Sequence, residues 1–192
     1  MPDHLMNRNI ESTQGRSAAP LPRGLNLGCG RKRREGCLNV DRSASVRPDL
    51  VWNLDEFPYP LPGSHFNHVY ASDVVEHVAN IPAFMGEVHR VSAPGAILEI
   101  TTPHFSCSNS YTDPTHLHHL GYFSFDYFTP DNELNFYSDA RFEAVERQIV
   151  FIPGPFNRIV QNLANRHPAA YEQRFAWVFP AWFMIFRLRA IK

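Results

Sequence analysis

The sequence has little net charge, few cysteines and no apolar segment of membrane-spanning length. A net charge of −1 gives no overall field that would attract nucleic acid, so we predict no nucleic-acid partner. The cysteines Cys29, Cys37 and Cys107 are odd in number and lack zinc-ligand spacing, which predicts free thiols in a reducing compartment. The apolar residues 175–186 fall short of the roughly 20 that a membrane-spanning helix needs. Together with the lack of an apolar N-terminal signal, these features predict a cytoplasmic protein.

The length of the chain favours a single domain. A chain of 192 residues can bury a sizeable core but is short for two domains. Residues 1–20 are polar and show no apolar period, so we predict a flexible N-terminal arm followed by one domain over residues 21–192. The 16 prolines cluster in connections, which favours long ordered loops over long helices.

A short apolar run that ends in two glycines, Leu25 to Gly30, is the stretch that best indicates a ligand site. A buried parallel strand ends this way when the chain must turn sharply against a ligand, because glycine permits positive φ and close backbone approach. The dinucleotide fingerprint would need a third glycine where Arg33 stands, which disfavours a pyrophosphate ligand. Asp41 follows the next apolar segment, and its carboxylate can accept hydrogen bonds from a ribose. These features favour a nucleoside ligand without a phosphate.

Five segments of the sequence, which include the glycine-containing run and Asp41, follow one another in a fixed order: 25–30, 39–41, 53–66, 72–77 and 93–95. Their order and spacing resemble the class I S-adenosylmethionine-dependent methyltransferases, in particular a small bacterial branch with a short loop between the first two strands. The resemblance covers roughly residues 22–152. It implies an α/β, Rossmann-like fold: a mostly parallel seven-strand sheet with one antiparallel strand and reduced helices. It also implies S-adenosylmethionine as the cofactor.

The family's cofactor-binding positions fall after the first four strands. The resemblance implies cofactor contacts by Asn26, Gly28, Cys29, Gly30, Asp41, Asn53, Leu54, Ser72 and His77. Asn53 departs from the family pattern, in which an acid is frequent at this position. Its amide can still form hydrogen bonds with the edge of an adenine ring.

Apolar patterning and breaker residues place the helices and strands. We predict strands at 24–28, 38–40, 48–52, 66–71, 96–101, 141–150 and 184–191. An N-cap at Asn80, with apolar residues at helical spacing after it, predicts a helix that ends before Pro94-Gly95. Pro155 opens a second helix that runs to residue 166.

Residues 102–140 are predicted to form a substrate-side loop region, rich in histidine and aromatic residues. The stretch 113–116, Asp-Pro-Thr-His, resembles the substrate-side loop of the same bacterial branch. Three roles fit the histidines: a catalytic base, a metal site, or buried imidazoles bonded to carbonyl groups. The metal site would draw on His104, Asp113, His116 and His118.

We predict that a histidine acts as the base. The first choice is His116, because the Asp113-Pro114 turn fixes its approach, and His104 is the second. These two histidines and Asp113 are the predicted catalytic residues. We predict no metal, because displacement at a sulfonium methyl group requires none.

The predicted function is methyl transfer from S-adenosylmethionine to a small-molecule or glycan/lipid-linked acceptor. Two alternatives stay open: a non-catalytic protein that binds S-adenosylmethionine as a scaffold, and a histidine-bound metal hydrolase. Residues 175–186 are predicted to form a closing hairpin over the core. Alternatively, this aromatic segment forms a surface for peripheral membrane contact or for a homodimer.

Overall fold

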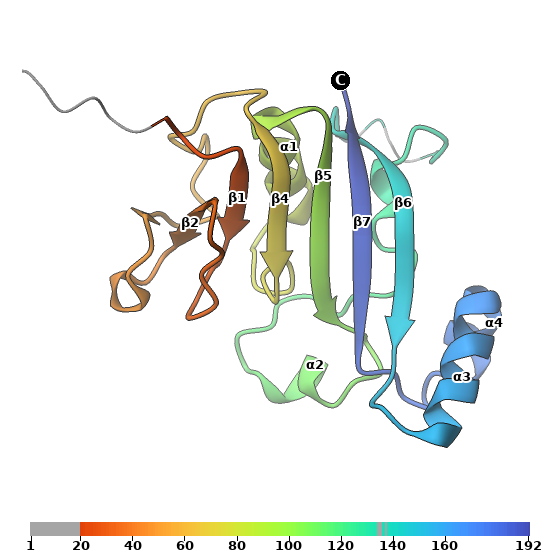
Figure 1. Ribbon diagram of the computed structural model, residues 1–192. Coiled ribbons are helices and arrows are strands. Elements are labelled where there is room, and N and C mark those ends of the chain that lie inside the picture. The colour runs from red at the N-terminus through yellow and green to blue at the C-terminus, as the bar shows by residue number, and fades with distance from the viewer. Residues whose placement is uncertain (1–19, 134–135, 137) are drawn as a thin grey trace, which may run out of the picture.

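The computed structural model describes residues 20–133, 136 and 138–192, which fold around one mixed β-sheet (Figure 1). The strands are β1 Gly24–Leu27, β2 Cys37–Asp41, β3 Leu50–Val51, β4 Phe66–Ser72, β5 Ser92–Pro103, β6 Arg141–Val150 and β7 Phe183–Ile191. Their order across the sheet is β3-β2-β1-β4-β5-β7-β6. The pairs from β3 to β5 are parallel, whereas β7 is antiparallel to both β5 and β6. The predicted fold class is confirmed.

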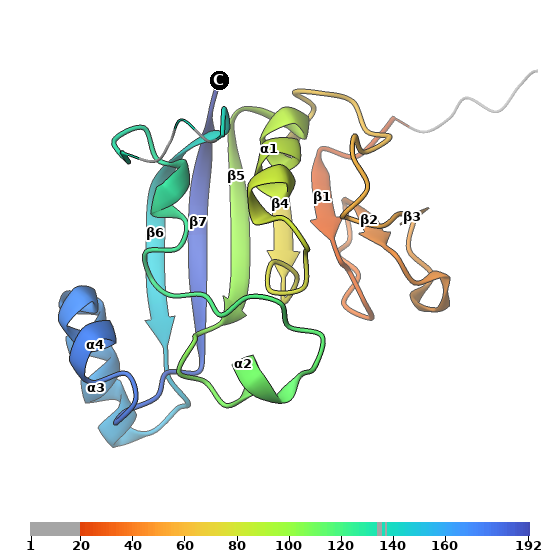
Figure 2. The same ribbon diagram turned by 180° about the vertical axis from the view of Figure 1, so that it is seen from behind.

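The helices are short, as the resemblance implied. They are α1 Ile81–Val91, α2 Asn109–Thr112, α3 Pro155–Arg166 and α4 Pro168–Arg174, with 3-10 turns η1 Ala44–Val46 and η2 Asp126–Phe128. Figure 2 shows α1 lying over β4 and β5, while α3 and α4 lie beside the outer strand β6. Within the described ranges, no helix has both the length and the apolar character needed to cross a membrane. The predicted N-terminal arm, apart from Pro20, lies outside the described residues.

The start of α1 follows the capping signals in the sequence. Asn80 Oδ1 accepts a hydrogen bond from the Ala83 N–H at 2.9 Å, and Pro82 lies in the first turn. The helix ends at Val91, because Ser92 adopts an extended conformation there. Both predictions for the helix, its N-cap and its apolar face, are confirmed.

The start of β5 differs from the prediction. The strand begins at Ser92 instead of residue 96, so Pro94 and Gly95 lie inside the strand. The register between β4 and β5 shifts at this point, and Gly95 has φ +75°. Pro94 and Gly95 therefore lie at an irregularity in the pairing of β4 with β5 and do not end the helix.

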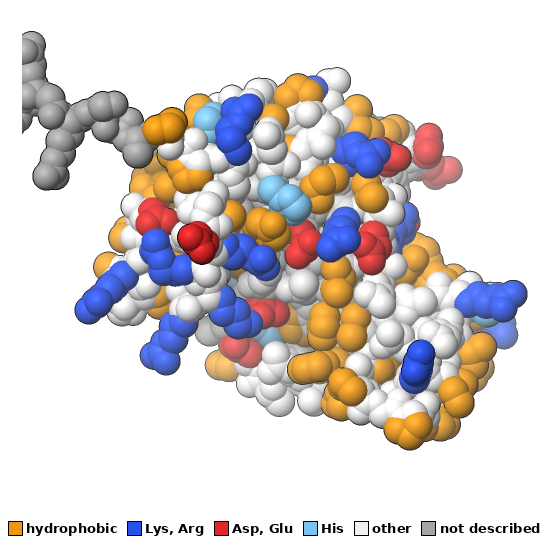
Figure 3. All heavy atoms as spheres, viewed as in Figure 1, with side chains coloured by type: hydrophobic (Ala, Val, Ile, Leu, Met, Phe, Trp, Pro, Cys, Tyr) orange, Lys and Arg blue, Asp and Glu red, His pale blue; other side chains and the backbone are white. Residues whose placement is uncertain are grey.

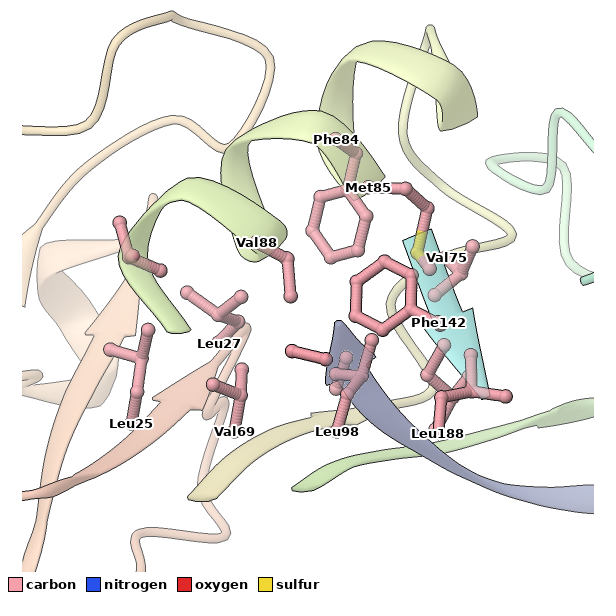
Figure 4. Close-up of a cluster of buried hydrophobic side chains, with 14 of the residues drawn as sticks. Leu25, Leu27, Val69, Val75, Phe84, Met85, Val88, Leu98, Phe142 and Leu188 are labelled. Carbon is pink, nitrogen blue, oxygen red and sulfur yellow. The ribbon is translucent and has the colours of Figure 1, made fainter. Parts of the chain in front are cut away.

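The main core lies between α1 and one face of the sheet. Phe84, Met85 and Val88 point from α1 toward the strands (Figure 4). They pack against buried strand residues, among them Leu27, Val69, Leu98, Phe142 and Leu188. Each of these side chains contributes roughly 1.5–3 kcal/mol when fully buried. This packing fixes the strands, and thereby the loops that follow them.

The opposite face of the sheet is polar, and none of the described helices covers it (Figure 1). Arg187 on β7 forms ion pairs with Glu99 on β5 and Glu146 on β6, at 3.1 and 3.0 Å. Figure 3 shows charged side chains of both signs on this face. An antiparallel region of a sheet commonly has one solvated face, which explains the alternating polar pattern along β6 and β7.

The last two strands, β6 and β7, form an antiparallel pair, and α3 and α4 lie in the connection between them. The predicted strands at 141–150 and 184–191 and the helix at 155–166 are confirmed. Residues 175–181 do not join the hairpin. The Trp182 N–H pairs with the Val150 carbonyl, and β7 begins only at the next residue. Phe175, Trp177 and Val178 are exposed, with Trp177 at 68%, whereas Ala176 and Ala181 are buried in a second core cluster.

The carboxyl ends of β1, β4 and β5 lie at the lower edge of the sheet in Figure 1. The chain after β5 returns along this edge, and His104 pairs with Leu120 through a backbone bridge. The backbone N–H groups of Leu117 and His118 both point to the carbonyl oxygen of Glu76, in the turn after β4. The histidine-rich segment is therefore attached to the end of β4, beside the glycine turn after β1.

Candidate functional site

A cavity of about 290 Å³ opens at the carboxyl ends of β1, β2 and β4, which we call the main pocket. Ligands of open α/β sheets bind at this edge. The walls come from the turn after β1, the end of β2, the segment after β3, the turn after β4 and one residue of the histidine-rich segment. The lining residues are Gly28, Gly30, Asp41, Arg42, Asn53, Leu54, Asp55, Asp73, Val74, His77, Val78 and Thr115.

Two glycines shape the floor of the main pocket. Gly28 and Gly30 have φ +60° and +47°, in the left-handed region that favours glycine. A Cβ on Gly28 would lie 2.4 Å from Val74 Cγ2, so this glycine allows the β1 turn to pack against the β4 turn. A Cβ on Gly30 would meet nothing within 4 Å. Gly30 therefore leaves an open space at the pocket wall.

Asp41 ties the turn after β1 to the end of β2. Its Oδ2 accepts a hydrogen bond from the Gly30 N–H at 2.8 Å, and its Oδ1 accepts one from the Ser43 N–H at 2.9 Å. A carboxylate has about four acceptor positions, so both oxygens can accept a further hydrogen bond from a ligand. The carboxylate is thus oriented by the backbone before a ligand arrives.

Three of the predicted cofactor residues lie on the other side of the glycine turn. Asn26, Cys29 and Ser72 line a second cavity of about 480 Å³, together with the basic run 31–34. Asn26 is 3% exposed, and its Nδ2 donates to Asn39 Oδ1 and to the Lys32 carbonyl. This amide holds the turn in place and has little capacity left for a ligand.

The basic run 31–34 is largely tied to the protein. Arg33 binds the Asp49 carboxylate, and the guanidinium of Arg34 lies 3.8 Å above the ring of Tyr70. Lys32 Nζ lies 3.5 Å from Asp73 Oδ2, with both side chains exposed. These pairs hold the run on the surface of the protein, next to the second cavity.

The histidines of residues 102–140 separate into different environments. His104 is fully buried, with Nδ1 2.8 Å from Ser106 Oγ and Nε2 3.2 Å from Glu172 Oε1 on α4. It does not line the main pocket. His118 contacts the Val78 carbonyl through Nε2, and His119 contacts Ser110 through Nδ1. These contacts match the structural role for three of the histidines.

The structure brings His116 together with His77, at the edge of the main pocket. Their rings meet edge to face, with centroids 4.7 Å apart. His77 and Thr115 line the pocket, and the His116 side chain is 4% exposed behind them. Asp113 Oδ2 lies 3.8 Å from His116 Nε2. Of the predicted catalytic residues, His116 and Asp113 are neighbours, and His104 stands apart from them.

Glu76 lies under this histidine pair and is 2% exposed. Its Oε2 accepts a hydrogen bond from Thr102 Oγ1 at 3.0 Å, and its Oε1 has no hydrogen-bond partner in the described part of the chain. Loss of water around the carboxyl group raises the pKa of Glu76. A buried acceptor without a partner is uncommon in folded proteins and calls for a physical explanation.

Residues 8–148 of the sequence match a family model described as a methyltransferase domain. The matched range covers most of the chain and all four strands that bear the main pocket. The chain belongs to this methyltransferase-domain family. Its fold is that of the class I methyltransferases. Comparison with curated proteins finds no match.

Solved structures of similar fold support the architecture of this methyltransferase. One is an S-adenosylmethionine-dependent methyltransferase from Mesorhizobium loti, with 17% identity and a TM-score of 0.56, covering 88% of this chain and 91% of that one. Another, from Archaeoglobus fulgidus, has 17% identity and a TM-score of 0.54, covering 88% of this chain and 86% of that one. The [4+2]-cyclase SpnF has 16% identity and a TM-score of 0.55, covering 89% and 75%. At such identities the likeness shows the fold alone.

The main pocket of the methyltransferase suits the cofactor predicted from the sequence. The oriented Asp41 carboxylate can accept hydrogen bonds from two vicinal hydroxyls, and the open space at Gly30 allows a ligand to approach the backbone. The pocket unites six of the predicted cofactor residues: Gly28, Gly30, Asp41, Asn53, Leu54 and His77.

Several residues of the main pocket were absent from the prediction. They are Arg42, Asp55, Asp73, Val74, Val78 and Thr115. Five of these directly follow a predicted site residue or the Asp113-Pro114 turn along the chain. Their position next to predicted site residues in the sequence was therefore the signal that could have identified them.

Proposed function

We propose that this protein is an enzyme that transfers a methyl group from S-adenosylmethionine to a small-molecule or glycan/lipid-linked acceptor. The main pocket carries this proposal, because it combines an oriented carboxylate, an open glycine turn and a histidine at a single edge of the sheet. A structural cavity would need none of these features. When bound, the cofactor supplies an electrophilic methyl group on a sulfonium centre.

The roles of the cofactor residues follow from their places around the main pocket. Asp41 accepts hydrogen bonds from the ribose hydroxyls, and Asn53 and Leu54 border the adenine. His77 stands at the methionine end, beside the turn after β4. Asn26, Cys29 and Ser72 support the glycine turn from the second cavity. Holding the reacting groups in line in this way can contribute roughly 7–11 kcal/mol to catalysis.

The acceptor is activated at the His77–His116 pair. The pair lies where the histidine-rich segment meets the turn after β4, so an acceptor above the methyl group would approach it. The Asp113 carboxylate beside His116 is kept charged, because two hydrogen bonds from Thr115 lower its pKa. We assign His116 and Asp113 to catalysis and give His104 a structural role, as its contacts with Ser106 and Glu172 suggest.

An exposed aromatic surface supports a lipid-linked acceptor. The surface consists of Phe156, Ile159, Leu163, Phe175, Trp177, Val178, Phe179 and Trp182, each at least 37% exposed. Arg158 and Arg166 lie on α3, which also carries Phe156, Ile159 and Leu163, and Arg174 lies on α4. Aromatic side chains and arginines on short amphipathic helices favour the interface of an anionic membrane. We propose this contact in preference to a homodimer.

Calorimetric titration with S-adenosylmethionine and with its demethylated product tests the proposed cofactor site. Asp41→Ala should weaken binding by about 1–3 kcal/mol, because a charged acceptor loses its hydrogen bonds. Asp131→Ala, at an exposed aspartate distant in sequence from the pocket, is the matched control and should bind like the parent. Equal affinity for the parent and Asp41→Ala would exclude the main pocket as the site.

A further inference from the structure

Three side chains at the edge of the main pocket meet the geometric requirement for a shared ion. One carboxylate oxygen of Glu76, one ring nitrogen of His77 and one of His116 lie within 4.8 Å of one another. They come from two segments: the turn after β4 and the histidine-rich segment after β5. The metal set expected from the sequence, with His104 and His118, is not gathered, because those rings contact Ser106, Glu172 and the Val78 carbonyl.

The imidazole rings of His77 and His116 are each held through their Nδ1 atom. His77 Nδ1 lies 3.2 Å from the Thr115 carbonyl, and His116 Nδ1 lies 3.3 Å from the Ser110 carbonyl. A carbonyl only accepts hydrogen bonds, so each Nδ1 is the protonated nitrogen that donates. The lone pair of each neutral ring is then on Nε2. Histidine ligands of metals are commonly fixed in this way by a hydrogen bond from the other nitrogen.

The unpartnered oxygen of Glu76 is an independent observation. Thr102 occupies Oε2, and Oε1 is left buried without a donor in the described residues. Burying a carboxylate without a partner is costly, whereas a cation would satisfy the free oxygen.

We propose that Glu76, His77 and His116 form a binding site for a divalent transition-metal ion, with Asp113 at its edge. Two imidazoles and one carboxylate suit zinc, iron, cobalt or manganese, while magnesium and calcium prefer oxygen ligands. The three-residue set leaves coordination positions open, as in catalytic metal sites. Asp113 Oδ2, at 3.8 Å from His116 Nε2, is near enough to support the site.

The ligand atoms need to approach one another only slightly. Metal bonds of about 2.1 Å in a tetrahedral arrangement separate the ligand atoms by roughly 3.4 Å. Here the three ligand atoms all lie within 4.8 Å of one another. Small rotations of the two rings and the Glu76 side chain would close this gap without movement of the backbone.

The proposed metal site would take part in the methyl transfer proposed above, and its role in catalysis rests on that proposed function. His77 lines the main pocket, so a bound ion would face the acceptor. A metal ion lowers the pKa of a coordinated hydroxyl group, which an oxygen acceptor needs before it attacks a methyl group. The histidine pair then activates the acceptor as metal ligands, and His116 does not act as a free base.

Cobalt(II) titration of the full, untagged chain tests the site after treatment with a chelator. Calorimetry and visible absorption should report one cobalt ion per chain. His116→Ala and Glu76→Gln should each weaken cobalt binding by about 10–100-fold or more. His119→Ala is the matched control on the same segment and should bind like the parent, since its ring contacts Ser110 and Tyr111 outside the cluster.

A measurement on the parent protein avoids reliance on folded variants. Diethyl pyrocarbonate modifies accessible imidazoles, and saturating manganese(II) should slow modification of His77 while leaving His119 unchanged. Substoichiometric cobalt binding, unprotected His77, or equal cobalt affinity in His116→Ala and Glu76→Gln would each overturn the metal site. S-adenosylmethionine binding is measured on the same samples. If the parent binds S-adenosylmethionine but not the metal ion, the metal site is excluded and the proposed function stands. If the parent does not bind S-adenosylmethionine, the proposed function is excluded whatever the metal titration shows.

Discussion

Alanine at Gly28 should destabilise the protein more than alanine at Gly30, although both glycines have positive φ. The strain of a left-handed residue costs about 1–2 kcal/mol at either position. At Gly28 the new Cβ would also lie 2.4 Å from Val74 Cγ2, and at Gly30 it would meet nothing within 4 Å. Overpacking of this kind adds about 1–3 kcal/mol. We therefore expect a loss of about 2–5 kcal/mol for Gly28→Ala and about 1–2 kcal/mol for Gly30→Ala.

Urea unfolding of four variants tests the cause of this difference. Val74→Ala removes the methyl groups that the Gly28 Cβ would meet. The double variant Gly28→Ala/Val74→Ala should therefore be more stable than the sum of the single effects predicts, by about 1–3 kcal/mol. The same cycle with Gly30→Ala should be additive. Equal losses at both glycines, or additivity in the Gly28 cycle, would refute the proposed contact between the two turns.

Three further predictions concern the site and the surface. His116→Ala should lower the rate of methyl transfer by roughly 10²–10⁴ with near-parental cofactor affinity; parental turnover would remove this residue from catalysis. The raised pKa of Glu76 means that the metal-free folded state holds this proton more tightly than the unfolded state, so its stabilising effect is lost as pH rises above the ordinary glutamate value of about 4.3. Glu76→Gln should thus gain stability relative to the parent as the pH rises above about 4.3, and a pH-independent difference in unfolding free energy would contradict this. Trp177→Ala with Trp182→Ala should reduce sedimentation with phosphatidylglycerol vesicles, whereas neutral phosphatidylcholine vesicles should bind the parent weakly; equal binding of parent and variant would exclude the aromatic surface.

The fold was predictable because its signals are local. The capping of α1 by Asn80, the helix that begins at Pro155 and the alternating pattern of β6 each depend on a few neighbouring residues. The start of β5 was not predictable in this way. Proline and glycine at 94–95 are ordinary helix-ending signals, and only the pairing with β4 shows that they belong to a strand irregularity.

The candidate site was predictable in part. The glycine turn and Asp41 share one pocket, as expected from strands whose carboxyl ends meet at one edge. The association of Glu76, His77 and His116 depends on contacts between segments about 40 residues apart, which no local pattern encodes. The burial of His104 depends in the same way on Glu172, which lies on α4. Sequence patterns identify the histidines as candidates for the site. The tertiary contacts then separate those at the main pocket from those with a structural role.

A crystal structure of the protein with S-adenosylhomocysteine tests the central claim most directly. The account predicts the nucleoside in the main pocket, with its ribose hydroxyls bonded to the Asp41 carboxylate and its sulfur beside His77. A nucleoside bound in the second cavity against the basic run 31–34, or no bound nucleoside at saturating concentration, would contradict the account.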